Sequence, residues 1–171
     1  MKKRLIIIVL VLVIIFIFIK LKNRTKSLDL NEQMAFFEKV SFKEFENRKI
    51  FVRQKTLFST IYIIGKSGTK IDEFDYGIEY YDYTKKLIIT RRSENFDEIV
   101  DLKQIKRLLD KFNDYNLFFL SVKKDTLLIN ATYNNMEPHL LKIKNLNTKE
   151  KIKTHGNTFY YFKNGWYKRS D

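Results

Sequence analysis

Apolar residues follow one another without a break over residues 5–19, and basic residues stand on both sides of this run. A helix of that length rises about 22 Å, and Leu21 extends it if the stem of Lys20 lies along lipid. The hydrocarbon core of a bilayer is about 30 Å thick, so the run meets the lower limit for a spanning helix. The pattern therefore predicts a transmembrane signal anchor over residues 5–21.

The residues on each side of the anchor narrow this interpretation. Residues 1–4 form a basic N-terminal flank, and residues 22–29 form a polar tether. A cleaved signal peptide is the main alternative, because its apolar region has about 7 to 15 residues, but cleavage needs small residues just downstream. The downstream flank here is bulky and basic, and the only alanines are Ala35 and Ala131. These features favour an uncleaved anchor, and a buried helix of a soluble domain is the least favoured alternative.

The orientation of the anchor is only weakly indicated by charge. Three basic side chains precede the run and four follow it, so the positive-inside rule is nearly balanced. A short basic N-terminus ahead of an apolar run is the usual arrangement of an anchor whose amino end stays in the cytosol. We therefore expect a single-pass cell-membrane protein with an extracytoplasmic domain.

Beyond the tether, residues 30–171 are long enough for one domain with its own core. Apolar residues three and four positions apart predict helices over residues 31–49, in one piece or two, and from Asn95 to Phe112. Period-2 and β-branched patterns predict strands elsewhere. The predicted strands are residues 50–64, 74–83, 86–92, 116–123, 126–133, 139–144, 151–154, 158–162 and 166–169.

The connections between these predicted strands are short, which indicates how the strands pair. They leave no room for crossover helices, so the sheet should be mainly antiparallel. Asn164-Gly165 separates the last two strands, and this dipeptide favours the type I′ hairpin turn. The prediction is an α+β fold, in which a transmembrane helix precedes one domain of mainly antiparallel sheet with one or two packed helices.

Composition and charge exclude several classes of function. The net charge of +13 is uneven: residues 1–26 carry seven basic side chains and no acids, residues 27–138 are neutral, and residues 139–171 carry a net +6. Much of the basic character thus belongs to the anchor, which weakens the case for nucleic-acid binding. The absence of cysteine excludes disulfides, zinc–cysteine sites and thiol nucleophiles. The richness in Lys, Ile, Asn and Phe is typical of a bacterial, AT-rich genome.

Candidate catalytic chemistry is sparse in this sequence. His139 stands at a strand border and His155 in a turn, and neither has a second ligand at metal-binding spacing. Five carboxylates fall within residues 72–82, with no basic side chain among them. Clustered carboxylate oxygens can bind a hard metal ion, and two of them can act as an acid–base pair. The spacing of a known calcium loop is absent there. We predict no catalytic residue, no metal and no cofactor, and keep a membrane-tethered hydrolase that uses residues 72–82 as the alternative.

The last predicted hairpin, residues 159–169, interleaves aromatic and basic side chains. This pattern either buries aromatics on one face and solvates lysines on the other, or presents a surface to a protein, anionic lipid or nucleic acid. The candidate partner-binding residues are Tyr160, Trp166, Tyr167, Lys168 and Arg169.

Together these patterns predict a membrane-anchored, non-catalytic binding domain. It contacts membrane lipid through residues 5–21 and engages a protein partner at the cell envelope, as an accessory subunit or an immunity-type protein. If the domain faces the cytosol instead, the C-terminal hairpin would bind anionic lipid or nucleic acid.

Overall fold

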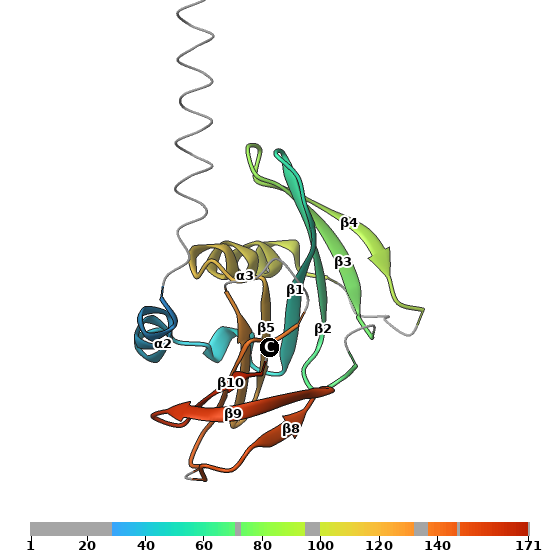
Figure 1. The fold of residues 1–171 in the computed structure, drawn as a ribbon. Helices are drawn as coiled ribbons and strands as arrows, with labels where there is room; N and C mark the ends of the chain where they lie inside the picture. The colour runs from blue at the N-terminus through green and yellow to red at the C-terminus, as the bar shows by residue number, and fades with distance from the viewer. Residues whose placement is uncertain (1–28, 71–72, 95–99, 132–136, 147, 171) are drawn as a thin grey trace, which may run out of the picture.

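Ten strands form a single sheet in this protein, and two α-helices pack on one face of it (Figure 1). The structure, a computed structural model, describes residues 29–70, 73–94, 100–131, 137–146 and 148–170. The helical elements are α2 (Leu30–Lys39), the 3-10 turn η1 (Lys43–Phe45) and α3 (Leu102–Asp114). The strands are β1 (Arg48–Lys55), β2 (Ser59–Lys66), β3 (Tyr76–Tyr81), β4 (Lys86–Arg92), β5 (Phe119–Lys123), β6 (Thr126–Asn130), β7 (Leu140–Ile143), β8 (Ile152–Thr154), β9 (Asn157–Lys163) and β10 (Trp166–Arg169).

The strand order across the sheet is β4-β3-β2-β1-β5-β6-β7-β10-β9-β8, and every neighbouring pair is antiparallel. The predicted α+β class with a mainly antiparallel sheet is thus confirmed for the described residues. The β9–β10 hairpin turns at the predicted dipeptide, where Asn164 and Gly165 have φ of 52° and 76°. Positive φ at both positions is what a type I′ turn requires.

The helix predicted over residues 31–49, in one piece or two, is present as two pieces, α2 and the short η1, but is wrong at its end, where β1 begins at Arg48. α2 ends at Lys39 because Val40 is extended, with φ of −97° and ψ of 152°. After η1 the chain enters β1 at Arg48, so the segment that follows alternates between the two faces of the sheet. The spacing of apolar residues predicts helix up to residue 49, but pairing with β2 and β5 makes the chain a strand from Arg48 onward.

The strand predicted over residues 50–64 is also wrong, because it is two strands joined by a tight turn. The chain reverses between β1 and β2 at Thr56, whose Oγ1 accepts the backbone N–H of Phe58 at 3.2 Å and of Ser59 at 3.0 Å. A threonine hydroxyl can satisfy such turn amides in place of ladder partners. The apolar character of Phe58 conceals this turn in the sequence.

The long amphipathic helix exists but begins later than predicted. Asp101 is its N-cap, and Oδ1 accepts the backbone N–H groups of Lys103 at 2.9 Å and Gln104 at 3.2 Å. Such a cap satisfies helix amides that would otherwise lack partners. The predicted cap at Asn95 lies outside the described residues.

Two apolar clusters lie on opposite faces of the sheet. The larger one packs the helices on the sheet, and Phe45 of η1 and Leu109 and Phe112 of α3 are each 0% exposed within it. The second cluster lies on the other face and contains Phe51, Ile63, Phe119, Leu128, Leu141, Phe159 and Tyr167. Both faces are thus buried over the middle of the sheet, as expected for central strands.

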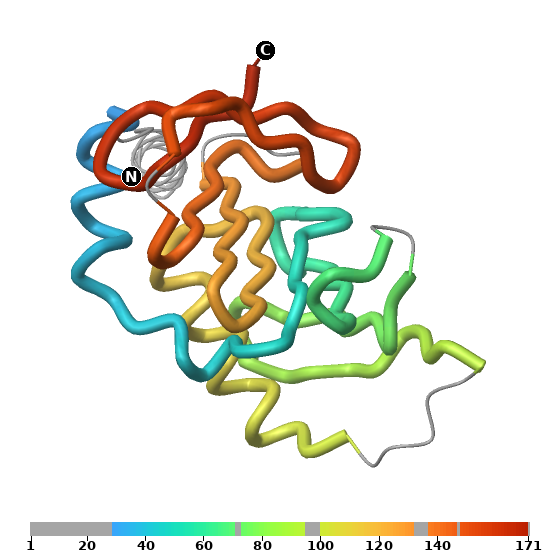
Figure 2. The backbone as a smooth tube through the Cα atoms, turned by 90° about the horizontal axis from the view of Figure 1, so that it is seen from below, coloured from blue at the N-terminus to red at the C-terminus, as the bar shows by residue number. Residues whose placement is uncertain are grey.

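The sheet curls, because residues beside strands far apart in its order line one pocket. Gly68 follows β2 and His155 precedes β9, and both line this pocket although β1, β5, β6, β7 and β10 lie between β2 and β9 in the sheet. Figure 2 shows the C-terminal strands, in red, on one side of the domain and the green strands β2 to β4 on the other. Twist accumulated across antiparallel strands produces this curvature. The curl creates a concave face whose two rims come from distant parts of the chain.

The predicted anchor over residues 5–21, its flank and residues 22–28 of the tether lie outside the described residues. Within the described ranges, no helix is both long and apolar enough to cross a membrane. The case for a membrane anchor therefore rests on the amino-acid sequence of that segment.

Candidate functional site

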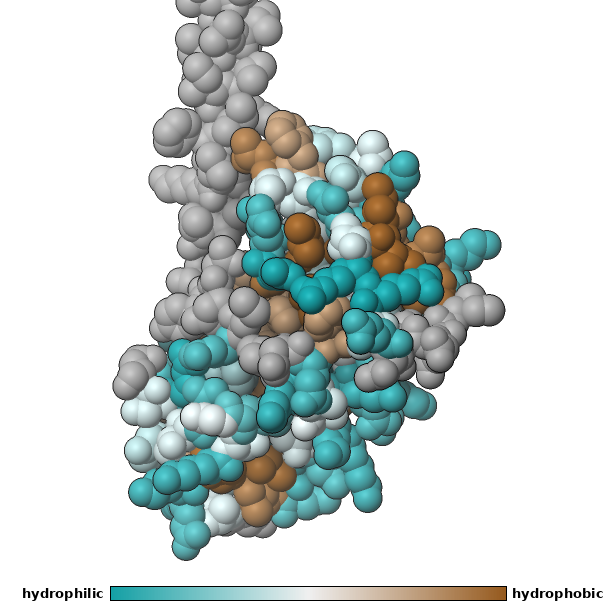
Figure 3. Space-filling model, turned by 90° about the vertical axis from the view of Figure 1, so that its right-hand side faces the viewer, coloured by the Kyte–Doolittle hydropathy of each residue, from teal (hydrophilic) through white to brown (hydrophobic). Residues whose placement is uncertain are grey.

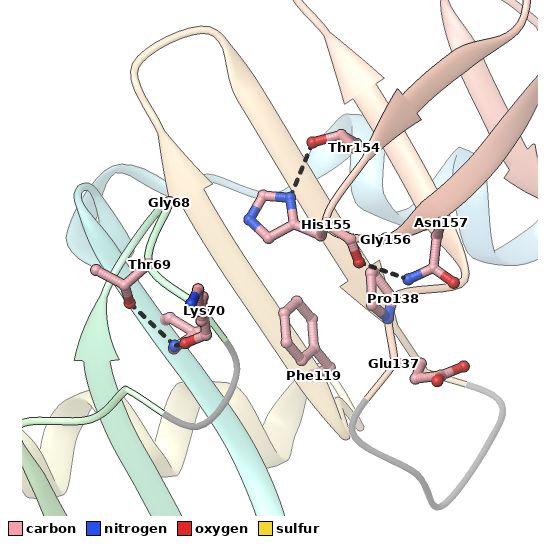
Figure 4. A pocket seen from close by; sticks show the side chains of 11 residues that line it. Gly68, Thr69, Lys70, Phe119, Glu137, Pro138, Thr154, His155, Gly156 and Asn157 are labelled. Carbon is pink, nitrogen blue, oxygen red and sulfur yellow. Dashed lines mark hydrogen bonds between the residues drawn. The ribbon is translucent and has the colours of Figure 1, made fainter.

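The concave face of the sheet contains a cleft of about 620 Å³ (Figure 4). One wall is the loop between β2 and β3, the opposite wall is the turn between β8 and β9, and a phenylalanine of β5 lies between them. The residues that carry its chemistry are Lys49, Thr69, Lys70, Phe119, Glu137 and His155. Its volume lies in the range of about 300–1,000 Å³ typical of ligand sites.

A buried lysine holds the β2–β3 wall in place. Lys49 of β1 is 1% exposed. Its Nζ donates to Thr69 Oγ1 at 3.0 Å, to the carbonyl of Glu73 at 2.7 Å and to the carbonyl of Lys70. Hydrogen bonds from a charged donor are stronger than neutral ones, so one ammonium group can hold several oxygens of the loop in a partly buried site. The ammonium group therefore positions the loop and adds positive charge to the cleft.

Two glycines allow the same wall to approach the sheet closely. A Cβ at Gly65 would lie 3.1 Å from Cα of Phe74 and 3.2 Å from the carbonyl of Glu73. Gly68 has a φ of +84°, and a Cβ there would lie 3.1 Å from Nζ of Lys123. Glycine at these positions is required by close approach and by backbone conformation. A second ammonium group, from Lys123, thus stands beside the loop.

The opposite wall ends in a two-residue turn that carries a histidine. His155 and Gly156 have φ of 51° and 75°, and Thr154 Oγ1 lies 2.9 Å from His155 Nδ1. Burial lowers the pKa of His155 below its ordinary value of 6.5, and the charges of Lys49 and Lys123 lower that pKa further. The imidazole is therefore neutral at pH 7, mainly because of burial and further because of the two nearby ammonium groups.

Positive charge dominates the cleft because its acid is neutralised. Among the described residues that line it, Glu137 is the acidic side chain, and its carboxylate pairs with the guanidinium of Arg169. Lys70 is exposed on the β2–β3 wall. Phe119 stacks on Phe51, with ring centroids 6.5 Å apart and 15° between the planes. The arrangement suits an anionic group that carries an apolar or flat portion.

The acidic stretch over residues 72–82 takes a different role in the part of the chain that is described. Glu79 accepts the hydroxyl of Ser59 at 2.8 Å on one oxygen and the hydroxyl of Tyr81 at 3.0 Å on the other. Its carboxylate thus belongs to a network that links β2 and β3. Asp72 lies outside the described residues. Across the described ranges, no three His, Cys, Asp or Glu side chains are close enough to hold a metal ion.

The five residues predicted to bind a partner do not form one surface. Trp166 and Tyr167 are 1% and 0% exposed, so they belong to the two apolar clusters and face away from solvent. Tyr160 is 49% exposed and pairs in register with Lys168 on one face of the sheet. Arg169 lies on the opposite face, where it pairs with the glutamate of the cleft. Trp166 packs against Phe37 of α2 on one face of β10, and Tyr167 belongs to the second cluster on the other face, which explains the burial of both aromatics.

The residues that build the cleft are not predicted by the sequence patterns. Lys49 falls in the stretch predicted as helix, and His155 is expected only as a turn residue. A usable signal for Lys49 is the run of β-branched and aromatic residues directly after it, Ile50-Phe51-Val52, which is typical of a strand. No signal in the sequence indicates that these two residues lie on opposite walls of one cleft.

No family model, no curated protein and no solved structure matches this chain. The function is therefore inferred from the geometry and charge of the cleft and from the sequence of the predicted anchor. Both are physical properties of the chain itself.

Proposed function

We propose that this protein is a single-pass membrane-anchored binding protein whose extracytoplasmic domain captures an acidic segment of a protein partner. It acts without catalysis, as an accessory subunit or an immunity-type protein at the cell envelope, and residues 5–21 supply the anchor. The observation that carries the proposal is the net positive charge of the cleft above its aromatic floor.

The chemistry of the cleft favours a carboxylate-bearing segment. Lys70 can pair with a carboxylate directly, while Lys49, whose protons are donated to protein oxygens, contributes through its field. Phe119 is only 2% exposed, so it would provide an apolar floor for the neighbour of that carboxylate rather than a ring face for stacking. The net +6 of residues 139–171 would steer an acidic partner toward the domain and raise the rate of encounter.

We expect the substitution Lys70→Glu to weaken partner binding about tenfold or more, because it places a negative charge where the partner's carboxylate would sit. The measurement is a quantitative pull-down from detergent-solubilised membranes with the full chain as bait. Crosslinking before lysis preserves weak complexes.

Lys103→Glu is the matched control for that substitution. It makes the same change of charge on the exposed surface of α3, on the other face of the sheet. Equal losses for both variants would show that only overall charge matters. Unchanged binding by Lys70→Glu would show that the partner does not use the cleft.

The affinity for an acidic ligand is expected to rise as the pH falls from about 8 to about 5.5, the range in which histidine titrates. Burial and the charges of Lys49 and Lys123 hold the pKa of His155 below its ordinary value. A bound carboxylate raises that pKa, so binding takes up a proton and becomes tighter at lower pH. Titration of the full chain with hexaglutamate, followed by the NMR signals of His155 and His139, checks this. A His155→Asn variant should lose this pH dependence, and an equal dependence in that variant would contradict the assignment.

A further inference from the structure

Two hairpin turns lie side by side at one end of the sheet, and both expose apolar side chains. The β1–β2 turn carries Leu57 and Phe58, and the β3–β4 turn carries Tyr83; we call these three residues the hairpin tip. The backbone N–H of Asp82 donates to the carbonyl of Phe58 at 3.0 Å, and the rings of Phe58 and Tyr83 have centroids 6.2 Å apart. The two turns therefore form one unit.

The hairpin tip is highly exposed. Leu57, Phe58 and Tyr83 are 63%, 65% and 69% exposed. Figure 1 shows both turns projecting beyond α3, and Figure 3 shows apolar surface at that upper end of the domain. Large apolar side chains grouped at a projecting point are unfavourable in water and mark a contact surface.

Basic residues flank the two turns of the hairpin tip along the chain. Lys55 precedes the first turn, and Lys85 and Lys86 follow Tyr83. The Nζ atoms of Lys55 and Lys85 lie 5.8 Å and 5.4 Å from the ring centroids of Phe118 and Tyr80, so both stems run along aromatic surface. Asp82 is the only acid in residues 53–59 and 82–86, which contain four basic residues. The end of the domain is therefore both apolar and cationic.

We infer that the hairpin tip inserts into the interface of an anionic bilayer, the same membrane in which the chain is anchored. A bilayer interface accepts a convex apolar point flanked by lysines, with the apolar groups below the headgroups and the ammonium groups among the phosphates. A protein partner would instead have to supply a pocket for a projecting tip. Charge complementarity and the shape of this end both favour lipid.

The short tether keeps the hairpin tip near the bilayer. This inference rests on the membrane anchor of the proposed function. The tether, residues 22–29, has eight residues and spans at most about 28 Å when fully extended. The domain is thus confined close to the bilayer, and a weak tip–lipid contact becomes intramolecular, at an effective concentration that reaches the millimolar range. Insertion would fix the orientation of the domain and hence the direction in which the cleft opens.

Single-cysteine variants of the full chain test the inference, because the natural chain contains no cysteine. Phe58→Cys and Tyr83→Cys are labelled with an environment-sensitive fluorophore and reconstituted in vesicles of phosphatidylcholine with about 30% phosphatidylglycerol, the anionic lipid that the basic residues require. Tyr160→Cys is the matched control, since Tyr160 is also an exposed aromatic, at 49%, but lies on β9. The emission of the buried Trp166 reports that each variant is folded.

The expected result is a blue-shifted label at positions 58 and 83, quenched at least about twofold more strongly by lipid-attached quenchers than the label at position 160. The difference should shrink in pure phosphatidylcholine and in a Lys85→Glu, Lys86→Glu background. Equal quenching at all three positions in floated vesicles overturns the inference but leaves the anchor intact. Failure of the full chain to float with vesicles overturns both the inference and the proposed anchor.

Discussion

Replacing Trp166 with alanine is expected to lower the free energy of unfolding by about 3–5 kcal/mol, the usual cost of emptying a large aromatic site in a core. The Trp166 side chain is 1% exposed, and its ring centroid lies 6.4 Å from that of Phe37 on α2. Its Nε1 donates to the carboxylate of Glu38 at 3.1 Å. The substitution would remove both the packing and the hydrogen bond that dock α2 on β10.

Denaturant unfolding of the full chain in mild detergent, followed by far-UV circular dichroism, measures this loss. Tyr160→Ala is the control, because Tyr160 is 49% exposed on the adjacent strand and its loss should cost less than about 1 kcal/mol. A small effect of Trp166→Ala would contradict the assignment of Trp166 to the core. It would return this residue to the set of candidate surface contacts.

Replacing Lys49 with methionine is expected to lower the free energy of unfolding by about 3 kcal/mol, because three partly buried oxygens lose a charged donor together. The methionine side chain keeps most of the stem but leaves Thr69 Oγ1 and the carbonyls of Lys70 and Glu73 without the ammonium group. The β2–β3 loop should then open, and hydrogen exchange in residues 66–70 should accelerate.

Lys70→Met is the matched control for the Lys49 substitution. It removes a positive charge from the same wall, but the Lys70 side chain is exposed and its carbonyl is retained, so the stability change should stay within about 0.5 kcal/mol. Similar stability for both variants would mean that the Lys49 ammonium group does not hold the loop. Substitutions at the two lysines should therefore have different effects. Lys49→Met should lower the stability of the domain, whereas Lys70→Glu should reduce partner binding without unfolding it.

Local features of the sequence predicted much of the secondary structure. The β5–β6 hairpin turns between the predicted strands 116–123 and 126–133, and the β9–β10 hairpin turns at Asn164-Gly165, because turn geometry depends on a few adjacent residues. The apolar stripe of α3 is also local, since residues three and four positions apart share one face of a helix. Each of these predictions needed only short-range information.

The ends of some strands and the residues of the candidate site could not be predicted from the sequence. The β1–β2 turn at Thr56 is satisfied by a threonine hydroxyl and carries apolar residues, so it lacks the usual glycine or proline signal. The hairpin pattern predicts Trp166 as a surface residue because the hairpin is basic, but α2 covers this face of β10 and Phe37 packs against the Trp166 ring. Which element covers a face of the sheet is a property of the tertiary structure, and a hairpin pattern alone does not contain it.

The sequence by itself determined the predicted anchor, the class of the domain, the hairpins and the uneven distribution of charge, because all of these follow from residue types close together in the chain. Only the tertiary structure decided that Lys49 and His155 stand on opposite walls of one cleft and that Phe58 and Tyr83 form one tip. The physical reason is the curl of the antiparallel sheet and its strand order, which bring together residues far apart in sequence through twist and packing summed over many strands.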